Sequence, residues 1–132
     1  MGGSTGHICT ACGSRFSVRQ GGGFFFDLLH CDACGRDQSV GHQELGDIHL
    51  RFVKGLGHPY AVCRMAIDRR IQEEYPGEPL DRDEYHAAAE ATLEPCPCGG
   101  RFRYEAPPRC PTCRSTSKSW KVDRTAPTVL YD

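Results

Sequence analysis

Eight of the nine cysteines in this 132-residue chain fall into four close pairs, and this spacing limits what the chain can fold into. The pairs read CTAC, CDAC, CPC and CPTC, and only Cys63 stands apart. A C-x-x-C turn directs two thiolates at one point, and two such turns complete the four-coordinate tetrahedron that zinc accepts. A disulfide within one turn would join nothing distant. The spacing therefore predicts metal binding.

The paired cysteines supply two complete sets of four ligands when they are taken in chain order. The first set has 18 residues between its two pairs and the second has 11, and both lengths suit a short β-hairpin. We therefore predict one metal site in each arm of the chain, with Cys9, Cys12, Cys31 and Cys34 in the first and Cys96, Cys98, Cys110 and Cys113 in the second.

The segments CTACGSRFSVRQGGGFFFDLLHCDACG and CPCGGRFRYEAPPRCPTC resemble zinc ribbons. The resemblance covers residues 7–41 and 95–122, and it implies cysteine knuckles joined by antiparallel strands, with one Zn²⁺ in each ribbon. Rubredoxin-like iron is the alternative occupant of the first site, because it uses the same four-thiolate geometry. The third pair departs from the pattern, since it is C-x-C. A glycine that can adopt a positive φ follows every pair except the last, where Arg114 stands: Gly13, Gly35 and Gly99.

The segment between the ribbons has the periodicity of short helices, expected over 44–57, 59–75 and 81–93. Asp81 and Glu84 have the spacing of a capping box, and Cys63 is expected to be a small core residue on one of these helices. We predict a small, metal-stabilised α+β protein in which two zinc ribbons are joined by a helical connector. The expected divisions are an N-terminal ribbon (1–43), an acidic connector (44–94), a basic C-terminal ribbon (95–124) and a tail (125–132).

Several features of the sequence favour a protein without catalytic activity of its own. Four cysteines per site leave no open coordination position, which a zinc catalyst requires. The first thirteen residues lack the charged start and apolar segment of a secretion signal, and no apolar stretch is long enough to cross a membrane. We therefore expect a cytoplasmic, zinc-binding accessory or scaffold subunit that contacts protein partners in a larger complex and does not bind a membrane.

Two other functions fit parts of the sequence. Basic and aromatic residues alternate in the C-terminal ribbon, as they do on surfaces that bind single-stranded nucleic acid: Arg101, Arg103, Tyr104, Trp120 and Lys121. The first alternative is therefore a nucleic-acid-binding zinc ribbon. The second is a rubredoxin-like iron protein that carries electrons.

Overall fold

The computed structural model describes residues 2–132, so the first residue of the expected N-terminal ribbon lies outside them. The chain divides into two compact units. Unit 1 combines both ends of the sequence, Met1–Val40 and Glu94–Asp132, and unit 2 is the segment Gly41–Leu93 between them. The segments that we expected to form two separate ribbons therefore belong to one unit, into which the helical segment is inserted.

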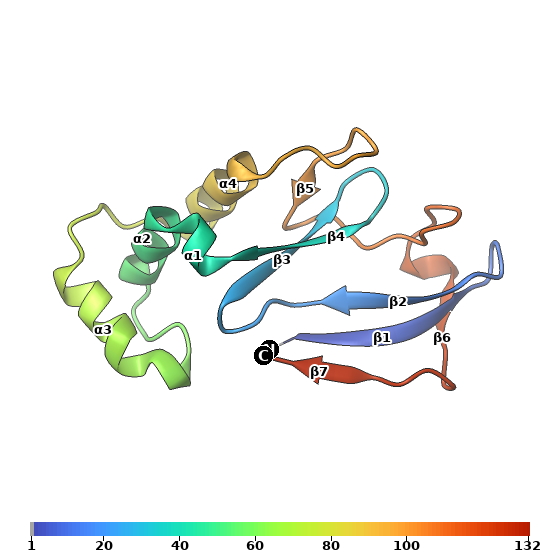
Figure 1. The fold of residues 1–132 in the computed structure, drawn as a ribbon, viewed down its shortest axis with the longest axis horizontal. Helices are drawn as coiled ribbons and strands as arrows, with labels where there is room; N and C mark the ends of the chain where they lie inside the picture. Colours follow the sequence, from blue (N-terminus) through green and yellow to red (C-terminus); the bar gives the residue numbers. More distant parts are fainter. Residues whose placement is uncertain (1) are drawn as a thin grey trace. The chain divides into compact units, whose positions relative to one another are not determined.

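Unit 1 contains two antiparallel sheets (Figure 1). The first has β1 (Gly2–Cys9) at its centre. One edge of β1 pairs with β2 (Arg15–Gln20), and the other pairs with β6 (Trp120–Val122) and β7 (Val129–Tyr131).

The second sheet of unit 1 has β3 (Phe26–Cys31) between β4 (Asp37–Gly41) and the short β5 (Phe102–Arg103). A 3₁₀ turn, η2 (Ser117–Ser119), leads into β6. Each sheet thus combines strands from both ends of the sequence.

Long-range strand pairing sets the position of the cysteines. Cys9, at the end of β1, is opposite Trp120 of β6, while Cys31, at the end of β3, is opposite Phe102 of β5. Each N-terminal cysteine pair therefore starts beside a C-terminal strand and not beside the other N-terminal pair.

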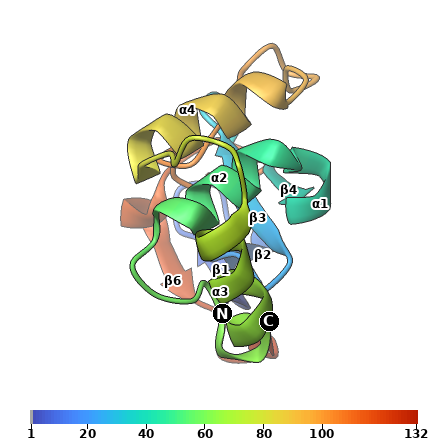
Figure 2. The same cartoon turned by 90° about the vertical axis from the view of Figure 1, so that its left-hand side faces the viewer.

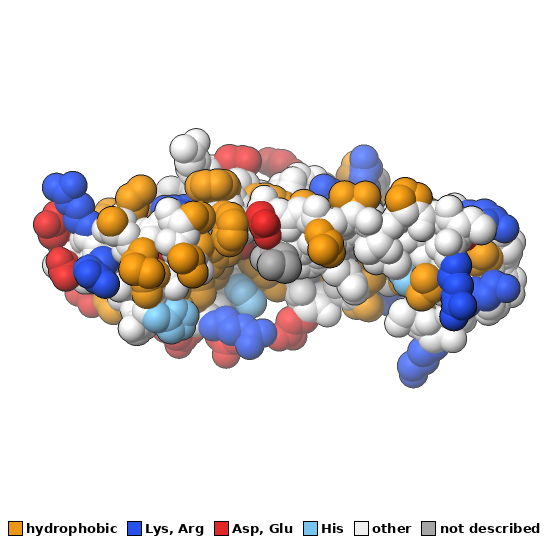
Figure 3. Space-filling model, turned by 90° about the horizontal axis from the view of Figure 1, so that it is seen from below, with side chains coloured by type: hydrophobic (Ala, Val, Ile, Leu, Met, Phe, Trp, Pro, Cys, Tyr) orange, Lys and Arg blue, Asp and Glu red, His pale blue; other side chains and the backbone are white. Residues whose placement is uncertain are grey.

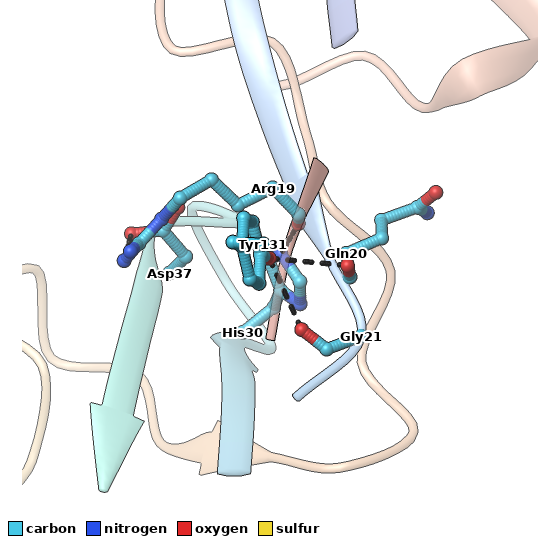
Figure 4. Close-up of polar contacts among 6 residues, drawn as sticks. All are labelled: Arg19, Gln20, Gly21, His30, Asp37 and Tyr131. Atoms are coloured by element: carbon cyan, nitrogen blue, oxygen red, sulfur yellow. Dashed lines mark hydrogen bonds and ion pairs between the residues drawn. The ribbon is translucent and has the colours of Figure 1, made fainter. Parts of the chain in front are cut away.

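Side chains tie the first sheet to the second at the end of β2 (Figure 4). Arg19 makes two hydrogen bonds to the carboxylate of Asp37 in β4, at 2.9 and 3.0 Å, and its carbonyl lies 3.0 Å from Nε2 of His30 in β3. The hydroxyl of Tyr131 in β7 donates to the carbonyls of Gln20 and Gly21, both at 3.1 Å. The expected C-terminal tail is therefore held on the sheet.

The core of unit 1 is small and rich in cysteine. Its buried apolar side chains are Cys9, Val18, Leu28, Leu29, Cys31, Val40, Cys96, Phe102 and Cys110. A core of this size provides little hydrophobic stabilisation, because small domains bury a low fraction of their surface. Bound metal would supply much of the missing folding free energy, about 10–16 kcal/mol for a structural zinc in small peptides at neutral pH.

Unit 2 consists of α1 (His42–Leu45), α2 (Asp47–Gly55), the 3₁₀ turn η1 (Val62–Arg64), α3 (Met65–Glu74) and α4 (Arg82–Thr92). Helix α2 packs against both α3 and α4 (Figure 2). The capping interaction expected at α4 is confirmed, since the Asp81 carboxylate accepts a hydrogen bond from the Glu84 amide at 2.8 Å.

The interior of unit 2 contains polar side chains as well as apolar ones. The rings of His42 and His49 stack at a centroid distance of 3.7 Å, and both side chains are buried. Asp68 is fully buried, where its Oδ2 accepts hydrogen bonds from the amides of Tyr60 and Ala61. This carboxylate therefore fixes the chain just before η1.

The expectation for Cys63 is wrong, because its side chain is exposed on η1. Ile67, one turn further on, is 58% exposed. The face of α3 that carries Ile67 is therefore not its buried face. Asp68 is the residue of α3 that turns inward.

The α+β class predicted from the sequence is confirmed, with two antiparallel sheets and four α-helices in the described residues. Over the same part of the chain, no helix combines the length and the apolar character needed to cross a membrane.

Candidate metal centres

The eight paired cysteines form two tetrads in unit 1, but the pairs combine differently from our expectation. Site 1 consists of Cys9, Cys12, Cys110 and Cys113, and site 2 consists of Cys31, Cys34, Cys96 and Cys98. The predicted contiguous sites, and with them two self-contained ribbons, are therefore wrong. The reason is the strand pairing, since β1 pairs with β6 and β3 with β5.

The sulfur atoms are spaced as a tetrahedral metal site requires. Within each tetrad all four sulfurs lie within 4.8 Å of one another. In site 1, Cys9 Sγ is 3.6 Å from Cys113 Sγ and Cys12 Sγ is 3.6 Å from Cys110 Sγ. In site 2 the corresponding distances are 3.5 Å for Cys31–Cys98 and 3.7 Å for Cys34–Cys96. A tetrahedron with metal–sulfur bonds of about 2.3 Å has edges of about 3.8 Å, so either tetrad can hold one metal ion.

The same backbone turn shapes three of the four knuckles. The amide of the residue after the second cysteine donates to the carbonyl of the first, as in Gly13 to Cys9, Gly35 to Cys31 and Arg114 to Cys110. In the C-x-C knuckle the corresponding bond, from Gly99 to Cys96, spans one residue fewer. The shorter spacing therefore changes the loop but still delivers both sulfurs.

All four residues that follow the knuckles have a positive φ. The values are 79° at Gly13, 74° at Gly35, 93° at Gly99 and 62° at Arg114. The prediction for the three glycines is confirmed, and Arg114 adopts the same conformation despite its side chain. The turn geometry, and not the residue type, is thus what these positions share.

Two serines that the sequence analysis did not single out lie against site 1. Ser115 Oγ is 3.1 Å from Cys9 Sγ and 3.2 Å from Cys113 Sγ, and Ser14 Oγ is 3.3 Å from Cys12 Sγ. Ser14 also donates to Thr112 Oγ1 at 2.7 Å, which joins the two knuckles. A signal for this pairing exists in the sequence, since CTACGS and CPTCRS share a serine that CDACGR and CPCGG lack.

Two hydrogen bonds of Asp32, one from its amide and one to its carboxylate, join the two knuckles of site 2. The Asp32 amide donates to the carbonyl of Arg101, and the Arg101 amide donates to Asp32 Oδ1, both at 2.9 Å. The amides of Ala33 and Cys34 point at Cys31 Sγ, at 3.4 and 3.5 Å. Such contacts hold the ligand sulfur in its orientation.

Each site contains thiols whose pKa is lowered and thiols whose pKa is raised. In site 1, burial raises the pKa of Cys110. The hydrogen bond with Ser115 lowers the pKa of Cys9 to about 6, and that with Ser14 lowers the pKa of Cys12. In site 2, burial raises the pKa of Cys34 and raises the pKa of Cys96 to about 12. A backbone hydrogen bond from Gly100 lowers the pKa of Cys98 to about 7. Metal binding displaces the protons of all four thiols in a site, so both sites should bind metal more weakly as the pH falls.

One known protein family matches most of the chain. The model of a family described as a domain of unknown function, DUF8255, matches residues 6–119. The chain belongs to this family. The region matched by DUF8255 includes both tetrads and the whole of unit 2. No curated protein and no solved structure matches the chain.

The residues expected to contact nucleic acid are divided between the two sheets of unit 1. Arg103 and Tyr104 lie at β5 within the DUF8255 region, where Arg103 pairs with Asp32 at 3.8 Å and Tyr104 donates to Asp27 at 2.7 Å. Arg101 is exposed beside them. Trp120 and Lys121 lie on β6, just beyond the matched region.

The aromatic members of this set are engaged in packing. The Trp120 ring meets the Phe16 ring edge to face at 4.9 Å and lies 5.4 Å from the His7 ring. Tyr104 is held by its bond to Asp27. The structure therefore does not bring the five residues together as one stacking surface.

Proposed function

We propose that this protein is a non-catalytic scaffold or accessory subunit, with zinc bound in both cysteine tetrads, that presents unit 2 to a protein partner. One observation carries the proposal: each tetrad offers four sulfurs at tetrahedral spacing. A metal with four thiolate ligands has no position left for a substrate. A closed site stabilises a fold, and the small core of unit 1 needs that stabilisation.

Zinc is the metal that we propose for both tetrads, with iron as the alternative at site 1 or site 2. Thiolates bind both metals in a tetrahedron, but zinc has no redox chemistry and suits a structural site. Elemental analysis of the protein purified from its own cells tests this choice. We expect two equivalents of zinc and a colourless protein, whereas a red protein with stoichiometric iron would indicate the rubredoxin-like electron carrier instead.

The partner surface that we propose lies on η1 and α3 of unit 2. Val62 is 83% exposed and Ile67 58%, and Met65 is exposed between them. Figure 3 shows hydrophobic side chains gathered over this part of unit 2. Exposed aliphatic side chains grouped in this way are typical of contact sites.

The charge of unit 2 indicates what kind of partner would fit. This unit has 10 acidic and 6 basic side chains, so its field attracts positive charge. We therefore propose a protein segment with an apolar centre and basic flanks as the occupant of the η1–α3 surface.

A capture experiment from the native cells tests this surface. The tagged wild type is compared with the double variant Val62→Asp/Ile67→Asp, which changes two exposed side chains and should not disturb the core. Val122→Asp, at an exposed position of β6 in unit 1, is the matched control. Each sample is divided and half is treated with nuclease.

The proposal expects a protein that resists nuclease, that Val122→Asp still captures and that the double variant loses. Equal capture by all three proteins would overturn the assignment of the surface. Capture that disappears with nuclease would favour the nucleic-acid alternative, for which exposed Lys118, Lys121 and Arg124 near β6 are the candidate contacts.

A further inference from the structure

Unit 1 contains a cleft of about 400 Å³ that neither tetrad requires. One wall is formed by β2 at 16–19, a second by the turn at 34–37 that follows site 2, and a third by the segment 108–111 that leads into site 1. The turn and the segment are in direct contact, because a Cβ on Gly35 would lie 2.2 Å from the amide nitrogen of Arg109. The volume is within the range of small-molecule sites, about 300–1,000 Å³.

The cleft is strongly basic. Three arginines and one carboxylate line it: Arg19, Arg36, Arg109 and Asp37. Asp37 neutralises Arg19 through two hydrogen bonds, which also fix the orientation of that guanidinium (Figure 4). Neither Arg36 nor Arg109 makes an ion pair with a carboxylate that lines the cleft.

Both of these arginines have donors to spare. Arg109 Nη1 donates to the Arg114 carbonyl at 3.2 Å, but its buried Nε has no hydrogen-bond partner among residues 2–132. A buried donor without a partner is rare in folded proteins, and an acceptor from outside the chain is one way to satisfy it. Arg36 is exposed, and within the described chain its side chain acts on Asp37 only through its charge.

Charge balance with the metal site is the competing explanation for these arginines. Four thiolates around a divalent ion have a formal charge of −2, and Cys34 of site 2 also lines the cleft. Arg109, however, makes no hydrogen bond to a cysteine sulfur in the described structure, and its Nε is left without an acceptor. The thiolates therefore do not account for its orientation.

Besides Ser17 and His30, the cleft also has apolar lining residues. Phe16, Val18, Pro108 and Pro111 line the cleft and offer a ring face and aliphatic surface without side-chain donors. A guanidinium pair binds phosphoryl oxygens well, since its planar donors match their geometry. We propose that this cleft binds the phosphoryl group of a phosphorylated ligand through Arg36 and Arg109, with the organic part of the ligand against Phe16 and the prolines.

Binding to the full-length, zinc-loaded protein tests the proposal. The probes are inorganic phosphate, adenosine monophosphate, adenosine and a short single-stranded oligonucleotide, followed by calorimetry and amide chemical shifts. We expect saturable binding of the monophosphate, weaker binding of phosphate and none of adenosine, with shifts at Ser17 and Arg36. Saturable oligonucleotide binding that needs the same arginines would identify a nucleic-acid phosphate as the source of the phosphoryl group.

Substitution of the cleft arginines distinguishes a phosphate-binding site from arginines that only balance the charge of the metal site. Arg36→Gln and Arg109→Gln should each weaken binding about tenfold or more, which is the effect of one charged hydrogen bond. Arg82→Gln, at an exposed position of α4 outside the cleft, is the control and should change nothing. Within residues 2–132, Arg36 makes no side-chain hydrogen bond, so its variant is expected to fold.

Three outcomes would overturn the proposal. The first is the absence of saturable binding of phosphate, monophosphate and oligonucleotide. The second is equal binding by wild type and both cleft variants. The third is loss of zinc from these variants while phosphate binding is undetectable in every protein, which would assign the arginines to charge balance at site 2.

Discussion

Arg114 occupies the one knuckle position in the described chain where a left-handed turn has a side chain. Its φ of 62° matches those of the glycines that follow the other three knuckles. For an L-residue this conformation costs about 1–2 kcal/mol. Hydrogen bonds at both of its ends hold the turn, since its amide donates to the Cys110 carbonyl and its own carbonyl accepts from Arg109.

Replacement of this residue by glycine should therefore stabilise the protein. We expect Arg114→Gly to raise the free energy of unfolding of zinc-loaded protein by about 0.5–1 kcal/mol, because part of the relief is offset by the flexibility of glycine in the unfolded chain. Denaturant titration at fixed zinc measures the change. Arg114→Ala removes the charge but keeps the Cβ, so a gain of the same size in that variant would contradict the backbone explanation.

Tyr131 gives a test of pH dependence on the alkaline side, where protons do not compete for the cysteines. Burial raises the pKa of its hydroxyl, which donates to two carbonyls of the chain at the end of β2. A raised folded-state pKa means that the stabilisation is complete below the unfolded value of about 10 and is lost as pH rises through the folded-state pKa.

We accordingly expect Tyr131→Phe to lower stability by about 0.5–1.5 kcal/mol at pH values near 8. Near pH 11, above the unfolded-state pKa, ionisation of the unfolded chain offsets part of the wild type's stabilisation, so the effect should be smaller. Thermal unfolding at the two pH values gives the difference. Ultraviolet absorbance should show one late-ionising tyrosine fewer in the variant. A destabilisation that stays constant across this range would argue against ionisation of Tyr131.

At the scale of the elements, the sequence predicts which cysteines bind metal but not which two pairs of cysteines share a metal ion. Each C-x-x-C knuckle and its following glycine are local patterns, so the metal-binding residues and the turns could be predicted. Four half-sites, however, combine into two tetrads in three ways, and all three satisfy tetrahedral geometry. The choice depends on β1–β6 and β3–β5 pairing across most of the chain, for which strands as short as Phe102–Arg103 give almost no pattern.

Paired substitutions distinguish the observed combination from the contiguous one. Cys12→Ser with Cys113→Ser removes two ligands of site 1, so we expect the loss of one zinc and the retention of the other. Contiguous ribbons would be damaged in both sites by the same change. Elemental analysis after dialysis against a weak chelator measures the ratio of zinc to protein.

The reciprocal pair is the control for this experiment. Cys12→Ser with Cys34→Ser removes one ligand from each tetrad, and we expect both metals to be weakened. A chain that keeps one full equivalent of zinc in this variant, and none in the other, would show that the tetrads are contiguous after all.

At the scale of the whole molecule, all eight tetrad cysteines belong to unit 1, and unit 2 enters as an insertion between the halves of site 2. The helices of unit 2 were predictable from their periodicity, but their role as an insertion was not, because it follows from contacts between the two ends of the chain. Unit 2 should therefore be dispensable for metal binding. We expect a chain in which residues 41–93 are replaced by about 12 glycine and serine residues to retain both zincs, since such a linker spans roughly 20 Å.

The shorter connection should even favour closure of site 2. It reduces the 61 residues between Cys34 and Cys96 to about 20. This lowers the entropic free-energy cost of closing the loop by about 1 kcal/mol. Trp120, the single tryptophan, packs on Phe16 beside site 1, so its fluorescence during chelator titration reports the state of unit 1. The same linker inserted after Gly57 of the full chain, in open space, is the control. Loss of zinc from the shortened chain alone would show that unit 2 contributes to metal binding. Units 1 and 2 would then fold cooperatively, and unit 2 would not be an independent insertion.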